Sequence, residues 1–488
     1  MSHLANLEAI LDTCDNKGLA KVTMHGIVTL KINTKREITD SMIYNAIYRT
    51  ILDFPRLSTV IIDSKTYPAG KTLEDLDLDC EISRITKCYS KDNLASMLFK
   101  DMNTAIKSPL GYRFRISVTG VNIVDGKPLV TLYIQTAMIH TLSDGMGTIL
   151  VVQKLGKYLE ESLHDNQLIS KTATLNTEKV VPIEKYHPIV PSSVPAYYGL
   201  WILIFVQRFC IGLFFMLQSA RNLLFYRSFS YSGSLDPSNV KCDNIQSPNG
   251  FRHLEMAPDI VEKLRLQARE VNGSIASVLI IASTLAYMSV VESNNVKLPK
   301  SYNLNFVVDS RRYCDDVAKG SLVQGSAFYP MPKYGYRLLD SDKFWDHVRA
   351  FKAIINYYLT YISPYIKVTS LFPYKLLALI FHLHKLNHKR DYPIAVSNLG
   401  SFTSEQLKLT KSIDIVDLMG SANTFWNANR HLFQVTSVTI SGRMRLMVTY
   451  PTYLVSDTEA DLFISQLNRV LHAVTTKNRE VTCKEARA

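Results

Sequence analysis

The run LVTLYIQTAMIH, from Leu129 to His140, constrains the fold more than any other feature of the chain, because it is nearly all apolar. A strand with one face in water alternates polar and apolar residues, whereas a strand buried on both faces is apolar throughout. The run therefore predicts a central strand over residues 128–139, inside a sheet that is covered on both sides.

Strand and helix patterns alternate around this run. Residues 23–32 and 112–119 are rich in β-formers and predict two further strands. Thr39-Asp40 predicts the start of a helix, and this helix ends near Phe54-Pro55 because proline disfavours helical geometry in the residue before it. A helix from about Met146 to Leu163 follows the central strand. Residues 1–163 are thus predicted to form a first α/β domain.

A second alternating block covers residues 249–488 and predicts a second α/β domain of similar size. Its predicted helices are 258–270, one that starts after Ser274, 342–359 and 457–474, and its predicted strands are 250–256, 303–309, 392–397, 412–417, 432–440 and 443–450. Residues 164–248 contain proline-rich and Ser/Gly/Asn-rich stretches that break regular structure, so this part of the chain is predicted to connect the two domains.

The connecting part contains the most apolar stretch of the chain, GLWILIFVQRFCIGLFFMLQ at residues 199–218. Twenty helical residues are about long enough to span a ~30 Å hydrocarbon layer, but Arg208 in the middle costs on the order of 3 kcal/mol there. A helix lying in the membrane interface, a re-entrant hairpin, a buried core helix and a lid over a substrate channel all fit the same residues.

The net charge is +12, and nearly all of this surplus lies after residue 150. Such an excess suits phosphate, a phosphorylated cofactor or an acidic membrane surface without choosing among them, and no nucleic-acid-binding motif is present. The seven cysteines are scattered and include no C-x-x-C pair. We interpret them as reduced thiols in a protein that faces the cytosol.

His140-Thr-Leu-Ser-Asp144-Gly145 lies where the central strand ends and the next helix begins. A histidine in such a loop can accept a proton near neutral pH, and Asp144 can orient the ring or hold the loop through an arginine. Gly145 lets the start of the helix approach a neighbouring element closely. The alternative is a solvent-facing histidine beside an aspartate that only caps the helix.

The order and spacing of several further segments resemble those of the fungal alcohol O-acetyltransferases and their N-acetyltransferase relatives, in the superfamily of acyl-CoA-dependent acyltransferases with an HxxxDG motif. Besides the motif itself, the matching segments are Phe54-Pro55-Arg56-Leu57, Pro109 to Arg113, Gly273-Ser274-Ile275, Val308 to Arg312 and Val396 to Gly400. The resemblance implies two chloramphenicol-acetyltransferase-like α/β domains with an active-site tunnel between them.

The resemblance also implies roles for individual residues. His140 would be the general base, and Asp144 would pair with an arginine of the second domain, either Arg311 or Arg312. Ser397 and Asn398 would be candidates for stabilising the oxyanion or for contacts on the CoA side, although Asn-x-Gly is also common in ordinary turns.

Acetyl-CoA is expected as a co-substrate, with no permanently bound cofactor and no metal. His384 and His388 stand one helical turn apart in the basic run 382–390, but no carboxylate or thiol stands next to them, so a solvated basic face is the preferred interpretation.

The sequence therefore predicts a monomeric enzyme that transfers an acetyl group from acetyl-CoA to a hydrophobic, sterol-like or other alcohol at a membrane surface. The endoplasmic reticulum or a lipid droplet is the expected location, with a role in lipid metabolism. N-acetylation of a long-chain, sphingoid-like amine and a non-catalytic lipid-binding role remain as alternatives.

Overall fold

Strand β8 (Lys127–Ile139) lies in the middle of the first sheet, as its apolar sequence predicts. The computed structural model describes residues 2–3, 23–62, 65–165, 169–175, 249–295, 298, 304–309, 311, 326–330, 338–357, 359, 393–423, 431–452, 454–477 and 479–488. Antiparallel neighbours flank β8, with β2 (Thr23–Asn33) on one side and β6 (Tyr112–Thr119) on the other. The complete order is β13-β2-β8-β6-β5, with β5 at Cys80–Ile85 and β13 at Ile413–Ala422.

Helices cover both faces of this sheet. Helices α2 (Asp40–Asp53) and α4 (Gly145–His164) pack together on one face, and α3 (Lys91–Met102) lies on the other. Thr39 caps α2 as predicted, since its hydroxyl accepts the Met42 N–H. A small sheet of the order β1-β4-β3 and a hairpin strand add to this lobe: β1 Ser2–His3, β3 Thr59–Ile62, β4 Lys65–Pro68 and β7 Asn122–Val124.

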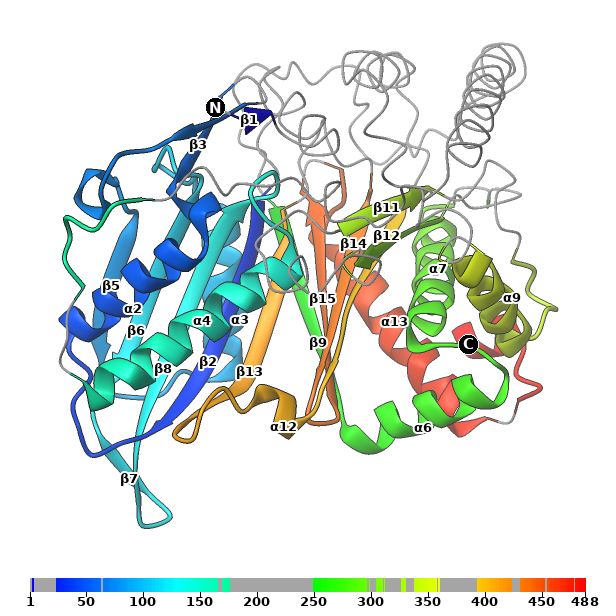
Figure 1. The fold of residues 1–488 in the computed structure, drawn as a ribbon. Coiled ribbons are helices and arrows are strands. Elements are labelled where there is room, and N and C mark those ends of the chain that lie inside the picture. The colour runs from blue at the N-terminus through cyan, green and yellow to red at the C-terminus, as the bar shows by residue number, and fades with distance from the viewer. Residues whose placement is uncertain are drawn as a thin grey trace, which may run out of the picture.

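The second lobe contains a sheet of the order β11-β10-β12-β14-β15-β9 with helices packed against it (Figure 1). The strands are β9 Asn249–Met256, β10 Leu304–Asp309, β11 Ser326–Pro330, β12 Ile394–Phe402, β14 Phe433–Ile440 and β15 Arg443–Pro451. The helices are α6 Pro258–Glu270, α7 Ile275–Ser293, α9 Phe344–Tyr357, α12 Ser404–Leu407, α13 Asp457–Thr476 and α14 Cys483–Arg487.

Helix α7 is apolar on all sides and forms the centre of the second lobe. Among the described helices it alone is long and apolar enough to cross a membrane, but 78% of its most apolar window is buried. It packs on α13, α9 and β12, which explains its composition as that of a core helix.

One strand from after residue 249, the predicted start of the second domain, belongs to the sheet of the first lobe. Strand β13 comes from the second block, yet it pairs antiparallel with β2 from Ile413↔Ile32 to Ala422↔Met24. Figure 1 shows β13, in orange, beside β2, in blue. The alternation of Ile413 and Ile415 indicated a strand, but an alternation pattern carries no information about which sheet the strand joins. The first sheet is thus completed by a strand from the second block.

Several features of the sequence analysis lie outside the described residues. They include most of the connecting segment, with its apolar stretch 199–218, the basic run 382–390, Arg312 and four of the cysteines.

Candidate active site

His140 directly follows β8, at the end of the first sheet where this central strand stops. Because β2 runs antiparallel to β8 and β13 runs antiparallel to β2, the start of β2 and the end of β13 lie at this same end of the sheet. The chain turns sharply after the strand, since the Ile139 carbonyl accepts the Leu142 N–H at 2.9 Å. His140 is only 7% exposed. It is therefore not a solvent-facing histidine, and it lies in the turn between the central strand and α4.

Asp144 binds an arginine from the other lobe. The Arg311 guanidinium donates to both carboxylate oxygens, from one Nη to Oδ2 and from the other to Oδ1, each at 2.9 Å. Both side chains are 4% exposed. The same carboxylate caps α4, because Oδ1 accepts the Gly147 N–H at 2.9 Å. The predicted interlobe pair and the alternative helix-cap role are thus both present, and the partner is Arg311.

The electrostatics of this pair keep it ionised. Burial alone would raise the pKa of the Asp144 carboxyl, but the charge of Arg311 and the hydrogen bonds from Arg311 and Gly147 hold that pKa below its ordinary value. Burial likewise acts to lower the pKa of Arg311, and the attraction of Asp144 and Asp309 raises it instead. Asp309 accepts from Arg311 at 3.1 Å and thereby orients the guanidinium from its own side of the interface.

Gly145 permits a close contact between α4 and the second lobe. A Cβ at this position would lie 2.8 Å from Cδ2 of Leu399 on β12. The predicted close approach is therefore confirmed, and the element approached is β12.

Ser397 and Asn398 lie within strand β12, which continues to Phe402, and so they do not form an isolated turn. The strand bulges between Asn398 and Ser401, where its register to β14 shifts. Gly400 adopts φ +100°, and its N–H donates to Oδ1 of Asn398 at 2.9 Å. The Asn398 side chain thus supports the bulge with its oxygen, and Leu399 places that bulge against the start of α4.

Arg56 contributes to the site although the sequence analysis gave it no role. Its side chain is buried in a short 3₁₀ turn, Pro55–Ser58, and it donates to the Thr141 carbonyl at 3.2 Å. The contact holds the backbone of the residue directly after His140. The signal for this role was a charged residue in the turn that follows the amphipathic helix α2.

Potential metal ligands do not cluster in the described part of the chain, where no group of three or more His, Cys, Asp or Glu side chains could hold an ion. Cys80, Cys88 and Cys483 are free thiols there.

Solved structures with this architecture include an O-acetyltransferase and a condensation domain. Trichothecene 15-O-acetyltransferase TRI3 from Fusarium sporotrichioides superposes with a TM-score of 0.65 at 11% identity, covering 96% of this chain and 94% of its own. SgcC5 from Streptomyces globisporus gives 0.61 at 10% identity, covering 97% and 99%. The first condensation domain of the calcium-dependent antibiotic synthetase gives 0.60 at 11% identity, covering 98% and 97%. These likenesses confirm the predicted class of two α/β lobes, while the tunnel stays a prediction.

A comparison with the sequences of curated proteins gave no match. The family model of the alcohol acetyltransferases matches residues 90–471, a span that includes the HxxxDG turn, Arg311 and β12. Together with the two-lobed fold, this match confirms the resemblance seen in the sequence: the chain is an acyltransferase that belongs to the alcohol acetyltransferase family.

Proposed function

We propose that this protein transfers an acetyl group from acetyl-CoA to the hydroxyl of a hydrophobic alcohol, with His140 as general base. One observation carries the proposal: the turn that holds His140 is fixed by the buried two-point pair between Asp144 and Arg311, which joins the two lobes. Family membership supports the class of reaction, and this geometry supports the proposal that His140 performs the proton transfer.

In the proposed reaction the His140 imidazole takes the proton of the acceptor hydroxyl while the oxygen attacks the thioester carbonyl. The tetrahedral intermediate then collapses, its carbon–sulfur bond breaks, and the departing CoA thiolate receives the proton from the imidazolium. Asp144 is a positioning residue here, because Arg311 occupies both of its oxygens.

The intermediate carries a negative oxygen that needs hydrogen-bond donors. Asn398 supports this step in the proposal, because its carbonyl oxygen is engaged by Gly400 and its NH₂ group is therefore the end available for donation. Ser397 is half-buried on the same strand and is the second candidate.

Thiol release from acetyl-CoA tests the proposal directly. The wild type, His140→Ala and His164→Ala are assayed with alcohols, sterols and long-chain amines. His164 is the matched control, because it lies at the far end of α4 with 75% of its side chain exposed. We expect His140→Ala to lose at least about 10²-fold in turnover, in line with the loss of a general base, and His164→Ala to lose none.

The same assay separates the alternatives. Turnover with amines only would replace the alcohol acceptor by a long-chain amine, and no turnover with any acceptor would favour a lipid-binding role. A His140→Ala variant with wild-type turnover would contradict the assignment of the base.

The membrane surface is a further part of the proposal. It is supported by the length and composition of residues 199–218, which suit insertion or interfacial binding. Deletion of these residues is expected to move the protein from the membrane pellet to the supernatant after ultracentrifugation of a cell lysate. Unchanged fractionation would remove this part and leave the enzyme assignment intact.

A further inference from the structure

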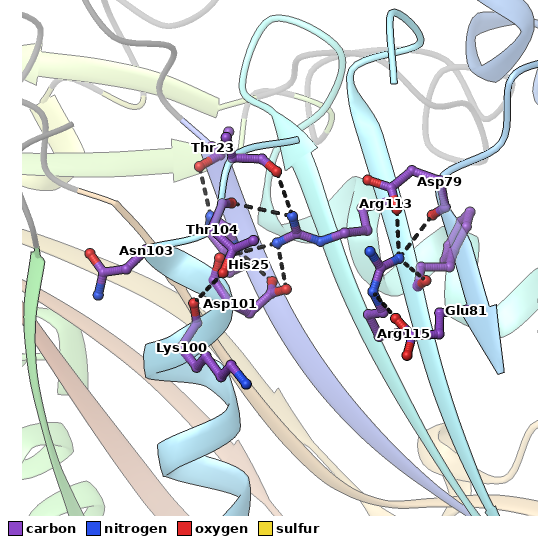
Figure 2. A network of polar contacts seen from close by, with 12 residues as sticks. Thr23, His25, Asp79, Glu81, Lys100, Asp101, Asn103, Thr104, Arg113 and Arg115 are labelled. Atoms are coloured by element: carbon purple, nitrogen blue, oxygen red, sulfur yellow. Dashed lines mark hydrogen bonds and ion pairs between the residues drawn. The ribbon is translucent and has the colours of Figure 1, made fainter. Parts of the chain in front are cut away.

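A buried polar cluster lies on the face of the first sheet that α3 covers, opposite α4. We call it the Asp101 cluster; its members are Thr23, His25, Asp101, Arg113 and Asn423. Figure 2 shows the side chains of His25 and Arg113 converging on Asp101. All five residues are 8% exposed or less. Charged groups at such depth are costly unless they are paired, so the cluster needs an explanation.

Asp101 links two strands through its two carboxylate oxygens. Oδ2 lies 2.7 Å from Nδ1 of His25 on β2, and Oδ1 accepts from Arg113 on β6 at 2.5 Å. Arg113 also donates to the carbonyls of Ala105 at 2.8 Å and Thr104 at 3.2 Å, which fixes the chain as it leaves α3. Both terminal nitrogens of the guanidinium thus have hydrogen-bond partners.

The hydrogen bonds continue from His25 to the end of β13. Nε2 of His25 lies 2.6 Å from the Thr23 hydroxyl, and that hydroxyl accepts from the Asn423 amide. Oδ1 of Asn423 in turn accepts the Thr23 N–H at 2.8 Å. A proton on Nδ1 of His25 lets that nitrogen donate to Asp101, and Nε2 lies within hydrogen-bond distance of the Thr23 hydroxyl.

Ala137 explains how one carboxylate reaches both strands. In the sheet, His25 and Arg113 lie directly opposite Ala137, one from each side of β8. Residues directly opposite one another point to the same face. Alanine leaves room above β8 for the Asp101 carboxylate, and that carboxylate therefore bridges the strands on either side. Ala137 precedes His140 by three residues, and Thr23 pairs with Ile139, the residue before His140.

We propose that the Asp101 cluster is a clamp across the end of β8 that sets the position of His140. The inference rests on the proposed function, because it gives the cluster its purpose through the general base. His25, Asp101 and Arg113 are positioning residues in this view. They hold β2 and β6 at a fixed separation on either side of β8. The end of β8 is then fixed as well, and with it the direction in which the turn carrying His140 leaves the sheet.

His25→Ala tests the clamp, because it cuts the bridge while leaving Asp101 paired with Arg113. We expect kcat to fall about 10- to 100-fold, the cost of displacing a catalytic group by around 1 Å, with little change in KM. His25→Asn is expected to recover most of the loss, since its amide nitrogen can replace Nδ1 as the donor to Asp101. Arg487→Met is the control: it also removes a largely buried arginine that is paired with two carboxylates, the half-exposed Glu292 and Asp340, but in the second lobe.

The decisive measurement is the effect of His25→Ala in a His140→Ala background. A clamp that acts through His140 has nothing left to position there, so the residual turnover should not fall further. A general loss of folded protein would lower it by the same factor as in the wild type. Amide hydrogen exchange over residues 141–147 should rise in His25→Ala and stay unchanged in Arg487→Met.

Three results would overturn the clamp: wild-type kcat in His25→Ala, an equal loss in the His140→Ala background, or an equal loss in Arg487→Met. Should His25→Ala not accumulate as folded protein, Ala137→Val tests the clamp instead. Its added methyl groups displace the Asp101 carboxylate, while no polar group of the cluster is removed. Wild-type kcat in that variant would likewise overturn the clamp. Full turnover in His140→Ala alone contradicts the proposed function instead, so the two failures are distinguishable.

Discussion

The Asp144 carboxylate both caps the start of α4 and binds Arg311 across the interface between the lobes. The helix cap and the pair with Arg311 share Oδ1 of this carboxylate, so the orientation of the HxxxDG turn and the docking of the second lobe are coupled. A buried ion pair of this kind fixes geometry more than it adds stability, but losing one partner leaves a charge without compensation.

Asp144→Asn should therefore lower the free energy of unfolding by about 3 kcal/mol at neutral pH, because the amide can still cap α4 but leaves the buried Arg311 poorly compensated. Urea denaturation measures the change. Asp53→Asn is the matched control, since its pair with Lys154 is 35–38% exposed and contributes at most about 1 kcal/mol.

The pKa of Asp144 also fixes how the stability of Asp144→Asn depends on pH relative to the wild type. The pKa of Asp144 lies below its ordinary value of 3.8 in the folded protein, so the pair stabilises the fold at higher pH and this stabilisation is lost as the pH falls below about 3.8. Asp144→Asn should accordingly show a shallower loss of stability in acid than the wild type. Parallel curves for the two proteins as the pH falls below about 3.8 would contradict the role of the pair.

At the level of elements, the contact between α4 and β12 restricts which residue can start the helix. Alanine in place of Gly145 would favour the helix by about 1 kcal/mol in isolation, but its Cβ would meet Leu399 at 2.8 Å. We expect Gly145→Ala to lose about 1–3 kcal/mol of stability and to lower kcat, because the turn carrying His140 must shift.

Leu399→Ala combined with Gly145→Ala removes the clash, and this double variant should recover part of both losses. Thermal melts and the thiol-release assay measure the two effects. A stabilised and fully active Gly145→Ala would show that the close approach is not needed.

Local signals predicted most elements of the chain well. Strand β6 and helix α6 have the predicted bounds, because a β-rich run marks the strand and Pro258 marks the start of the helix. Helix α3, which supplies Asp101, was not predicted. Its signal was nonetheless present, since Ser90 and Asn93 form a capping box and Leu94 and Leu98 follow at helical spacing.

Part of the candidate site could also be predicted from local sequence. His140, Asp144 and Gly145 lie within one short segment, and Arg311 was one of the two arginines expected to pair with Asp144. The Asp101 cluster and the contact of Arg56 could not be derived, because their partners come from separate elements and only the folded sheet places them next to each other. For the same reason the strand predicted at 412–417 was counted with the second domain, although it pairs with β2 of the first sheet.

At the scale of the whole molecule, the two lobes depend on each other. The first sheet takes its outer strand β13 from the second block, and the second lobe sends Arg311 into the first. Without β13, the 11 residues of β2 would present an unpaired edge.

Residues 1–248 produced alone should therefore fail to form a stable monomer, and co-production with residues 249–488 should restore a soluble complex. Size-exclusion chromatography with limited proteolysis checks both statements. A monomeric, protease-resistant 1–248 fragment would show that the first lobe does not need its strand from the second block.

The pairing of Thr23 with Asn423 also has a consequence for synthesis on the ribosome. The two residues are 400 positions apart, so at roughly 5–20 residues per second the nascent β2 waits about 20–80 s for its neighbour to be translated. During that interval the unpaired edge is open to other chains emerging on the same polysome. Slower translation should thus raise the share of newly made protein that is lost to aggregation or held by chaperones.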